Sequence, residues 1–291
     1  MLLIGENINI MNKTLKSAMK DKVKEPIQKF AIESQKNGVD YLDMNIGPAR
    51  KDGVELIKWL IETIREVSNL PLSIDTTNID AIKAGLEVEG ENAIINSIQA
   101  TEEKMNILLP LMKQYKCKCI ALLIGKEGMP RDVNERGALA AEFSSKIDEM
   151  GIPHQKVLFD PIVLPAPYQQ DQVVATLEFM KMFKEMFPDF GSTCGLSNVS
   201  NGAPEKLRPL INRTYFMMLA KYGMEGAILD AFDKEIIDMA KGEKETIKNL
   251  IWKATEEDIK LDDLSEEEKN YVKTVNILKG KSLYSHSWLK L

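Results

Sequence analysis

The chain has 291 residues, of which 44% are hydrophobic and 28% are charged. This composition is typical of a folded globular protein with a substantial core, and it argues against intrinsic disorder. The formal net charge of −6 and the pI near 5.3 argue against a protein that binds nucleic-acid backbones, because such proteins concentrate Lys and Arg on one face. No run approaches the roughly 18 apolar residues of a membrane span, and the first residues lack the pattern of a signal peptide.

The three cysteines, Cys117, Cys119 and Cys194, cannot build a disulfide framework, and one of them would always be left over. They predict reduced thiols and a cytoplasmic location. Cys117 and Cys119 lie two positions apart in a predicted strand, so they share one face of it and need not bind a metal.

Short apolar runs alternate along the chain with longer amphipathic runs, which is the pattern of repeated strand–helix units and of a parallel sheet. Helices are predicted between the strands, for example at residues 26–38, with Gly38 as the stop signal, and at residues 54–69. Eight strand–helix units favour a TIM (β/α)8 barrel over an open sheet. The eight predicted strands are residues 2–9, 41–47, 71–77, 92–98, 117–124, 157–163, 192–199 and 226–231.

The alternation ends near residue 243. The remaining sequence predicts two charged helices, and the second opens with Ser265 followed three positions later by Glu268, the spacing of a capping box. We therefore predict two parts, a barrel over residues 1–242 and a C-terminal helical extension over residues 243–291 that packs on the barrel. A role of the extension in docking a partner is the alternative.

Polar side chains occupy the ends of most predicted strands. In a TIM barrel these carboxyl ends meet at one mouth, where catalytic residues lie. Any single Asp or Asn could instead cap a helix or form a turn. So many of them at the same position, the end of a predicted strand, predict a polar site. The residues are Glu6, Asn7, Asp43, Asn45, Asp75, Thr76, Asn96, Ser97, Asp160, Ser197, Asn198 and Asp230.

Several kinds of chemistry are missing from this predicted mouth. The chain has two histidines, His154 and His286, and neither follows a predicted strand, which argues against a histidine base and against a metal site. There is no P-loop, no dinucleotide-binding glycine motif and no nucleophile elbow. The remaining ring of carboxylates and amides suits a planar, nitrogen-rich ligand that presents amino and ring N–H groups.

Seven stretches of the sequence together carry a family resemblance. They are GENIN (5–9), LDMNIGPA (42–49), SIDTTN (73–78), IINS (94–97), DPIVLPA (160–166), GLSNVS (195–200) and RPLINRTY (208–215). They resemble the pterin-binding methyltransferases, above all the methyltetrahydrofolate:corrinoid-protein methyltransferases. That family is related to dihydropteroate synthase and to the folate module of cobalamin-dependent methionine synthase. The resemblance extends over about residues 1–240, and GLSNVS together with RPLINRTY is its most specific part.

The resemblance implies a role for each matching residue. Asp160 and Asn96 would bind the 2-amino-4-oxo edge of the pterin, and Asp75 would lie beside its reduced ring. Asn198 would reach N5, the atom that carries the methyl group. An amide is no general acid near neutral pH, so we expect Asn198 to act as a hydrogen-bond partner whose contact strengthens as charge develops at N5.

Three further residues belong to the same expected site. Gly195 and Ser197 would form the wall beside the ligand, where glycine lets the backbone approach closely. Arg208 would lie near the substrate, although the loop before it, NGAPEKL, is longer than the family pattern.

The resemblance implies methyl transfer between N5 of tetrahydrofolate, or of 5-methyltetrahydrofolate, and the cobalt of a corrinoid. The corrinoid would arrive on a separate protein, because the chain lacks the D-x-H-x-x-G element that supplies a cobalt ligand in many corrinoid modules. The family also implies a homodimer. The acidic tail beyond residue 243 is longer than expected of the family's acetyl-CoA branch. Its length favours transfer from a methylated corrinoid to tetrahydrofolate in a demethylation pathway of the O-demethylase or methylamine and betaine type.

Three alternatives remain open. The first is methylation of a corrinoid iron–sulfur protein in acetyl-CoA synthesis. The second is dihydropteroate synthase, which would need a basic pyrophosphate site near the seventh strand, where this chain has GLSNVS. The third is a folate-binding protein without catalytic activity.

Overall fold

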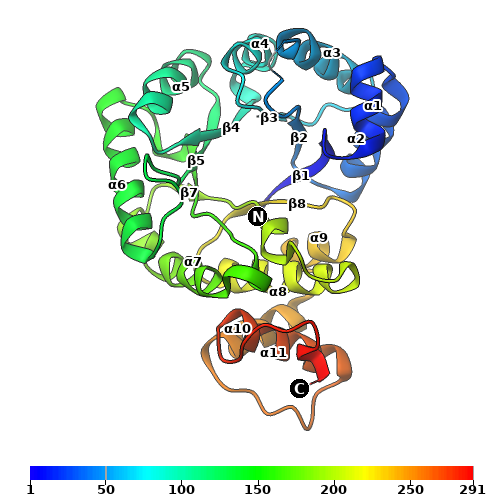
Figure 1. The fold of residues 1–291 in the computed structure, drawn as a ribbon, viewed down its shortest axis with the longest axis vertical. Coiled ribbons are helices and arrows are strands. Elements are labelled where there is room, and N and C mark those ends of the chain that lie inside the picture. Colours follow the sequence, from blue (N-terminus) through cyan, green and yellow to red (C-terminus); the bar gives the residue numbers. More distant parts are fainter. Residues whose placement is uncertain (50, 291) are drawn as a thin grey trace.

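The computed structural model describes residues 1–49 and 51–290 of the chain. Eight parallel strands form a nearly closed barrel at its centre, with helices arranged around them (Figure 1). In the sheet the strands follow the order β7-β6-β5-β4-β3-β2-β1-β8. The strands are β1 (Leu2–Asn9), β2 (Tyr41–Asn45), β3 (Leu72–Asp75), β4 (Ile94–Gln99), β5 (Lys118–Leu122), β6 (Val157–Asp160), β7 (Gly191–Ser192) and β8 (Gly226–Leu229).

The helices of the barrel lie outside the strands and follow them in chain order (Figure 1). They are α1 (Lys13–Asp21), α2 (Lys24–Asn37), α3 (Gly53–Arg65), α4 (Ile79–Glu89), α5 (Glu102–Tyr115), α6 (Val133–Met150), α7 (Ala166–Met186), α8 (Arg208–Lys221) and α9 (Lys234–Ala240). The predicted TIM barrel is therefore confirmed. Among the described residues, no helix is both long and apolar enough to cross a membrane.

Local sequence signals mark both the start and the end of helices. Gly38 ends α2, as predicted, in the left-handed region at φ 92°, a conformation that glycine adopts without strain. The side chain of Asp132 caps the start of α6 by accepting from the N–H of Glu135. Gly38 thus ends a helix before β2, and Asp132 begins one after β5.

The seventh strand is much shorter than predicted. β7 covers only Gly191–Ser192, and Leu196–Ser200 forms a 3-10 turn instead of the end of a strand. Single hydrogen bonds continue the sheet at this point, because the N–H of Ile228 donates to Cys194 O at 2.8 Å. The prediction of a strand to residue 199 was wrong because Ser and Asn favour local turns over a ladder.

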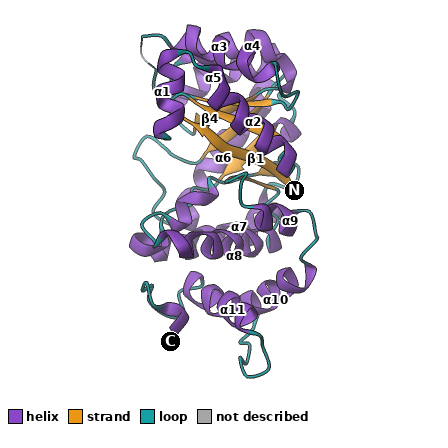
Figure 2. Ribbon diagram, turned by 90° about the vertical axis from the view of Figure 1, so that its right-hand side faces the viewer, coloured by secondary structure: helices purple, strands orange, loops and turns teal. Residues whose placement is uncertain are grey.

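The predicted C-terminal helical extension is present beside α7 and α8 (Figures 1 and 2). It contains α10 (Glu245–Glu256) and α11 (Glu266–Leu278), and Ser265 and Glu268 form the predicted capping box. The extension explains why α8 has no polar face, since the barrel covers one side of this helix and α10 and α11 cover another. Trp252 of α10 donates to Met217 O of α8 at 2.8 Å, and this hydrogen bond joins the extension to the barrel.

Candidate active site

The barrel interior changes from apolar to polar over two positions along four of the strands. A small buried cluster contains residues of five strands, namely Ile4, Tyr41, Ile94, Ile120 and Leu158. Side chains two positions apart on a strand point to the same side, so the residue after next also faces the barrel axis. At four strands that next residue is polar, in the pairs Ile4 and Glu6, Tyr41 and Asp43, Ile94 and Asn96, and Leu158 and Asp160. The cluster is thus the floor of the mouth, and the polar residues lie on it.

Asp43 is the centre of one hydrogen-bonded group in the mouth. It is 2% exposed, and its Oδ1 accepts from Ser73 Oγ at 2.6 Å and from Asn96 Nδ2 at 2.9 Å. Asn45 donates to the neighbouring Asp75 carboxyl. Burial raises the pKa of both carboxyls and the Asp43 carboxylate raises that of Asp75 further, so the pair holds one proton near neutral pH.

Asp160 ends β6 with both carboxyl oxygens engaged by backbone. Its Oδ1 accepts from the N–H of Ile162 at 2.8 Å, and its Oδ2 accepts from the N–H of Gly195 at 3.2 Å. Burial raises the pKa of Asp160 to about 6, although the two N–H donors act against this shift. The carboxylate is therefore ionised near neutral pH and held in one orientation, so its remaining lone pairs can accept from a ligand.

The turn after β7 carries the other predicted residues of the mouth. Ser197 Oγ donates to Glu6 Oε1 at 2.5 Å, and burial raises the pKa of Glu6 to about 7 against the effect of this bond. Asn198 is exposed, and its side chain makes no hydrogen bond within the described part of the chain. A Cβ at Gly195 would lie 3.0 Å from Asn198 Nδ2, so glycine leaves room for this amide. Asn198 is thus a free donor and acceptor at the mouth.

Arg208 supports this turn. Its Nε donates to Ser200 Oγ at 3.1 Å and its Nη2 to Ser197 O at 3.4 Å, so the guanidinium holds the turn in place. Arg208 also lines a hollow of about 270 Å³ together with Glu6, Ser197 and Asp230. A second hollow of about 150 Å³ is lined by Asp75 and Asn96. The predicted site residues are therefore all in or beside the mouth.

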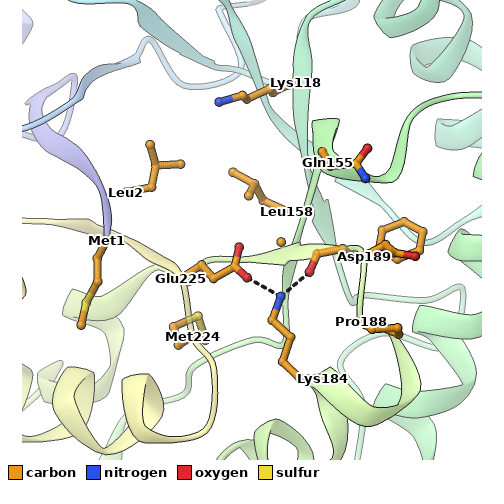
Figure 3. A pocket seen from close by; sticks show the side chains of 12 residues that line it. Met1, Leu2, Lys118, Gln155, Leu158, Lys184, Pro188, Asp189, Met224 and Glu225 are labelled. Carbon is orange, nitrogen blue, oxygen red and sulfur yellow. Dashed lines mark hydrogen bonds and ion pairs between the residues drawn. The ribbon is translucent and has the colours of Figure 1, made fainter.

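A third cavity lies at the opposite end of the barrel. It has a volume of about 690 Å³, larger than either hollow of the mouth, and Lys118, Lys184 and Glu225 are among the residues that line it (Figure 3). Lys184 forms an ion pair with Glu225 and donates to Phe190 O at 2.7 Å. None of the predicted site residues lines this cavity.

The cysteines and His154 contribute no reactive group to the mouth. Burial raises the pKa of the Cys117 thiol to about 11 and that of Cys194 well above its usual range, so neither is a ready nucleophile. His154 precedes β6, stacks on Phe190 and bonds Asp148. Among the described residues, no group of three or more His, Cys, Asp or Glu is arranged to hold a metal ion.

Three residues that shape the mouth were not among the predicted site residues. Asp43, Asn45 and Glu6 each contact a predicted site residue directly. All three were recognised as polar strand ends. The signal that could have selected them is their position in the strand, because Glu6 and Asp43 each lie two positions after a floor residue and Asn45 lies two positions after Asp43.

A comparison with protein families adds to this geometry. The model of the family described as pterin binding enzyme matches residues 8–230 of the chain. The chain belongs to the pterin-binding enzyme family. The match spans the barrel from the end of β1 to the end of β8, so it contains all the predicted site residues, although Glu6 lies just before it, and it confirms the resemblance found in the sequence.

Two curated relatives have named activities. The chain is 25% identical over 239 residues to a methylcorrinoid:tetrahydrofolate methyltransferase of Eubacterium limosum, covering 81% of this chain and 88% of the relative. It is 27% identical over 244 residues to a methionine synthase of Mycobacterium tuberculosis, covering 79% of this chain but only 20% of that protein.

Solved structures of dihydropteroate synthases share the fold. The enzyme from Xanthomonas albilineans, in complex with 7,8-dihydropteroate, superimposes with a TM-score of 0.66 at 17% identity over 84% of this chain and 93% of its own. The enzyme from Coxiella burnetii, in complex with pteroic acid, gives a TM-score of 0.64 at 14% identity over the same shares. At these identities the likeness concerns the barrel alone.

Proposed function

We propose that the protein is a methyltransferase that moves a methyl group from a methylated corrinoid on a separate protein to N5 of tetrahydrofolate. The observation that carries the proposal is Asn198, an exposed amide beside a ring of buried carboxyls, whose side chain makes no hydrogen bond to any residue that the structure describes. Such an amide is available to a ligand atom whose charge changes during reaction.

The ring of acids and amides fits the two edges of a reduced pterin. Asp160 and Asn96 would bind its 2-amino-4-oxo edge, because an ionised carboxylate accepts from the amino and ring N–H groups and an amide can donate to the oxygen. Asp75 would lie beside the reduced ring, and Gly195 with Ser197 would form the wall that leads to Asn198.

The relatives support methyl transfer over the other activities of the family. The likeness to the methylcorrinoid:tetrahydrofolate methyltransferase covers most of both chains, and the name of that relative states the direction that we propose. A dihydropteroate synthase would need basic side chains for pyrophosphate near the turn after β7. The arginine closest to that turn in sequence, Arg208, is occupied by Ser200 Oγ and Ser197 O.

The reaction forms the N5–CH3 bond and breaks the cobalt–carbon bond, whose electron pair stays on cobalt. N5 carries a positive charge until its proton leaves. Asn198 Oδ1 would accept from this N–H and stabilise the charge as it develops. Glu6 is a buried carboxyl on the same side of the mouth with a pKa near neutrality, so it is suited to take the proton and pass it to solvent.

The corrinoid is assigned to a partner protein. His154 lies before β6, away from the mouth, where it is engaged by Asp148 and Phe190. His286 lies in the segment after α11, where its ring meets that of Tyr284 edge to face. His154 is therefore not placed to ligate a cobalt above Asn198, and His286 lacks the sequence context of a cobalt ligand. The homodimer, the cytoplasmic location and the division near residue 242 remain predictions.

The test is an anaerobic assay with tetrahydrofolate and methylcobalamin, which stands in for the corrinoid of the partner. We expect methylcobalamin to be consumed in step with the appearance of 5-methyltetrahydrofolate. Binding of tetrahydrofolate without any transfer, to methylcobalamin or to purified methylated corrinoid proteins, would favour the non-catalytic folate-binding protein. Formation of dihydropteroate from a pterin pyrophosphate and p-aminobenzoate would contradict the proposal. Faster transfer to a corrinoid iron–sulfur protein would reverse the proposed direction.

A further inference from the structure

Arg136, in the first turns of α6, is fully buried beside the C-terminal end of β6. A buried guanidinium usually has an acidic partner, yet no ion pair of Arg136 occurs within the described residues. Its donors instead go to neutral oxygens. Nε donates to Pro161 O at 2.9 Å, Nη1 to Asp132 O at 3.1 Å, and Nη2 to Gln172 Oε1 at 3.2 Å and Thr176 Oγ1 at 3.1 Å.

One peptide plane connects this arginine with the mouth. The carbonyl oxygen of the peptide between Pro161 and Ile162 accepts from Arg136 Nε at 2.9 Å. The N–H of the same peptide donates to Asp160 Oδ1 at 2.8 Å. The plane therefore lies between a cation and a carboxylate, which polarise it in the same sense and strengthen both hydrogen bonds.

The backbone at Ile162 needs other contacts to hold its conformation. Ile162 has φ 67°, the left-handed region, which is costly for a β-branched residue. Rotating the Pro161–Ile162 peptide by about half a turn would bring φ back to an ordinary value and would turn the N–H away from Asp160. Arg136 opposes that rotation by holding the carbonyl of this peptide, and Thr176 holds the next carbonyl, Ile162 O, at 2.9 Å.

We propose that Arg136 is a positioning residue for Asp160, acting through the Pro161–Ile162 peptide that it locks in place. The inference rests on the proposed function, because there Asp160 binds the pterin. Arg136 touches no ligand. It keeps the Asp160 carboxylate oriented by keeping one of its two backbone donors oriented.

A merely structural role would give a different result. Arg136 also ties α6 to α7 through Gln172 and Thr176, so its loss could simply loosen the barrel wall. A double-substitution cycle separates the two roles, because a residue that acts only through Asp160 has no further effect once the Asp160 carboxyl is gone.

The cycle compares the wild type, Arg136→Met, Asp160→Ala and the double variant by their Kd for tetrahydrofolate. We expect Arg136→Met to weaken binding roughly ten- to hundredfold, the effect of a lost hydrogen bond to a charged group. In the Asp160→Ala chain the same substitution should change Kd by less than about threefold. Equal effects of Arg136→Met in both chains would overturn the inference.

Two controls guard against loss of folding. Ile147→Ala, in the last turns of α6 and fully buried, loosens the same helix and should leave the Kd unchanged. Arg136→Lys keeps the charge and one donor toward Pro161 O, so it should recover part of the affinity. If neither holds, the effect of Arg136→Met reflects helix packing and the inference fails.

A second measurement needs no folate and separates this inference from the proposed function. Carbon-13 NMR of the Asp160 carboxyl in the ligand-free protein reports its pKa, with the nearby Cys194 thiol remaining neutral throughout. Removing an N–H donor disfavours the ionised form, so Arg136→Met should raise this pKa. An unchanged pKa would overturn the inference even if tetrahydrofolate binds. A raised pKa would support it even if the wild type binds no folate.

Discussion

The two ends of the barrel hold their charged side chains in different ways. The larger cavity, about 690 Å³, lies at the N-terminal end of the barrel. There Lys184 forms an ion pair with Glu225 and donates a hydrogen bond to Phe190 O (Figure 3). The mouth has smaller hollows, but its buried carboxyls have raised pKa values, and the Asn198 side chain has no hydrogen-bond partner among the described residues. Buried acids without countercharges cost stability, so their concentration at one end is a better guide to function than volume.

The largest expected effect is on stability against pH. The pKa of Glu6 rises from 4.5 to about 7 on folding, so the folded state binds more protons between these values and loses stability as pH rises through 7. The loss for Glu6 is up to about 3 kcal/mol between pH 4.5 and 8. Urea unfolding of the wild type and of Glu6→Gln at pH 5 and pH 8 measures it, because the difference between the two proteins isolates Glu6. If the difference in free energy of unfolding between the two proteins were the same at both pH values, burial would not raise the pKa of Glu6.

Asp160→Asn tests the mouth by removing one charge without changing shape. Both carboxyl oxygens accept from backbone N–H groups, so the new amide group must face one of these donors. Together with the lost charge this should weaken tetrahydrofolate binding roughly ten- to hundredfold, measured by calorimetry. Unaltered affinity would mean that the pterin lies elsewhere.

Gly195→Ala is a smaller change at the same end. The new Cβ would lie 3.0 Å from Asn198 Nδ2 and would displace that amide by a few tenths of an ångström. We expect the rate of methyl transfer to fall roughly tenfold, since small misplacements at a reacting centre are costly. Gly137→Ala in α6 is the matched control, because nothing lies within 4 Å of its Cβ and the rate should not change.

The smallest effect is expected at the N-terminal end. Glu225→Gln removes the partner of Lys184 in the larger cavity. Because this pair is partly exposed, we expect a change of less than about 1 kcal/mol in stability. The folate affinity and the transfer rate should stay the same. A large loss of activity would overturn the distinction between the two ends.

Much of the barrel could be predicted from the sequence because its signals are local. β1 has the predicted bounds, and Gly38 and Asp132 mark helix ends that need no distant contact. β7 could not be predicted in this way. Its continuation depends on single hydrogen bonds to β6 and β8, such as that between Ile228 and Cys194, which a pattern of alternating residues does not contain.

The sequence predicted which residues form the candidate site, but not the hydrogen bonds that join them. Asp75 and Asp160 end β3 and β6, Asn96 lies within β4, and the sequence places all three at the mouth together. That Asp43 joins Asn96 to Ser73, or that Arg136 of α6 reaches the carbonyl of Pro161 after β6, depends on packing between segments far apart in the chain. A buried arginine has no periodic signature in a helix that is otherwise polar on one side.

Asn198→Ala tests the central claim most directly, through the rate of methyl transfer from methylcobalamin to tetrahydrofolate and the Kd for tetrahydrofolate in the same preparation. If the amide acts on the charge that develops at N5, the rate falls roughly a hundred- to a thousandfold, while the Kd changes by less than about threefold because most contacts with the pterin remain. An equal loss of rate and affinity, or an unchanged rate, would contradict the account.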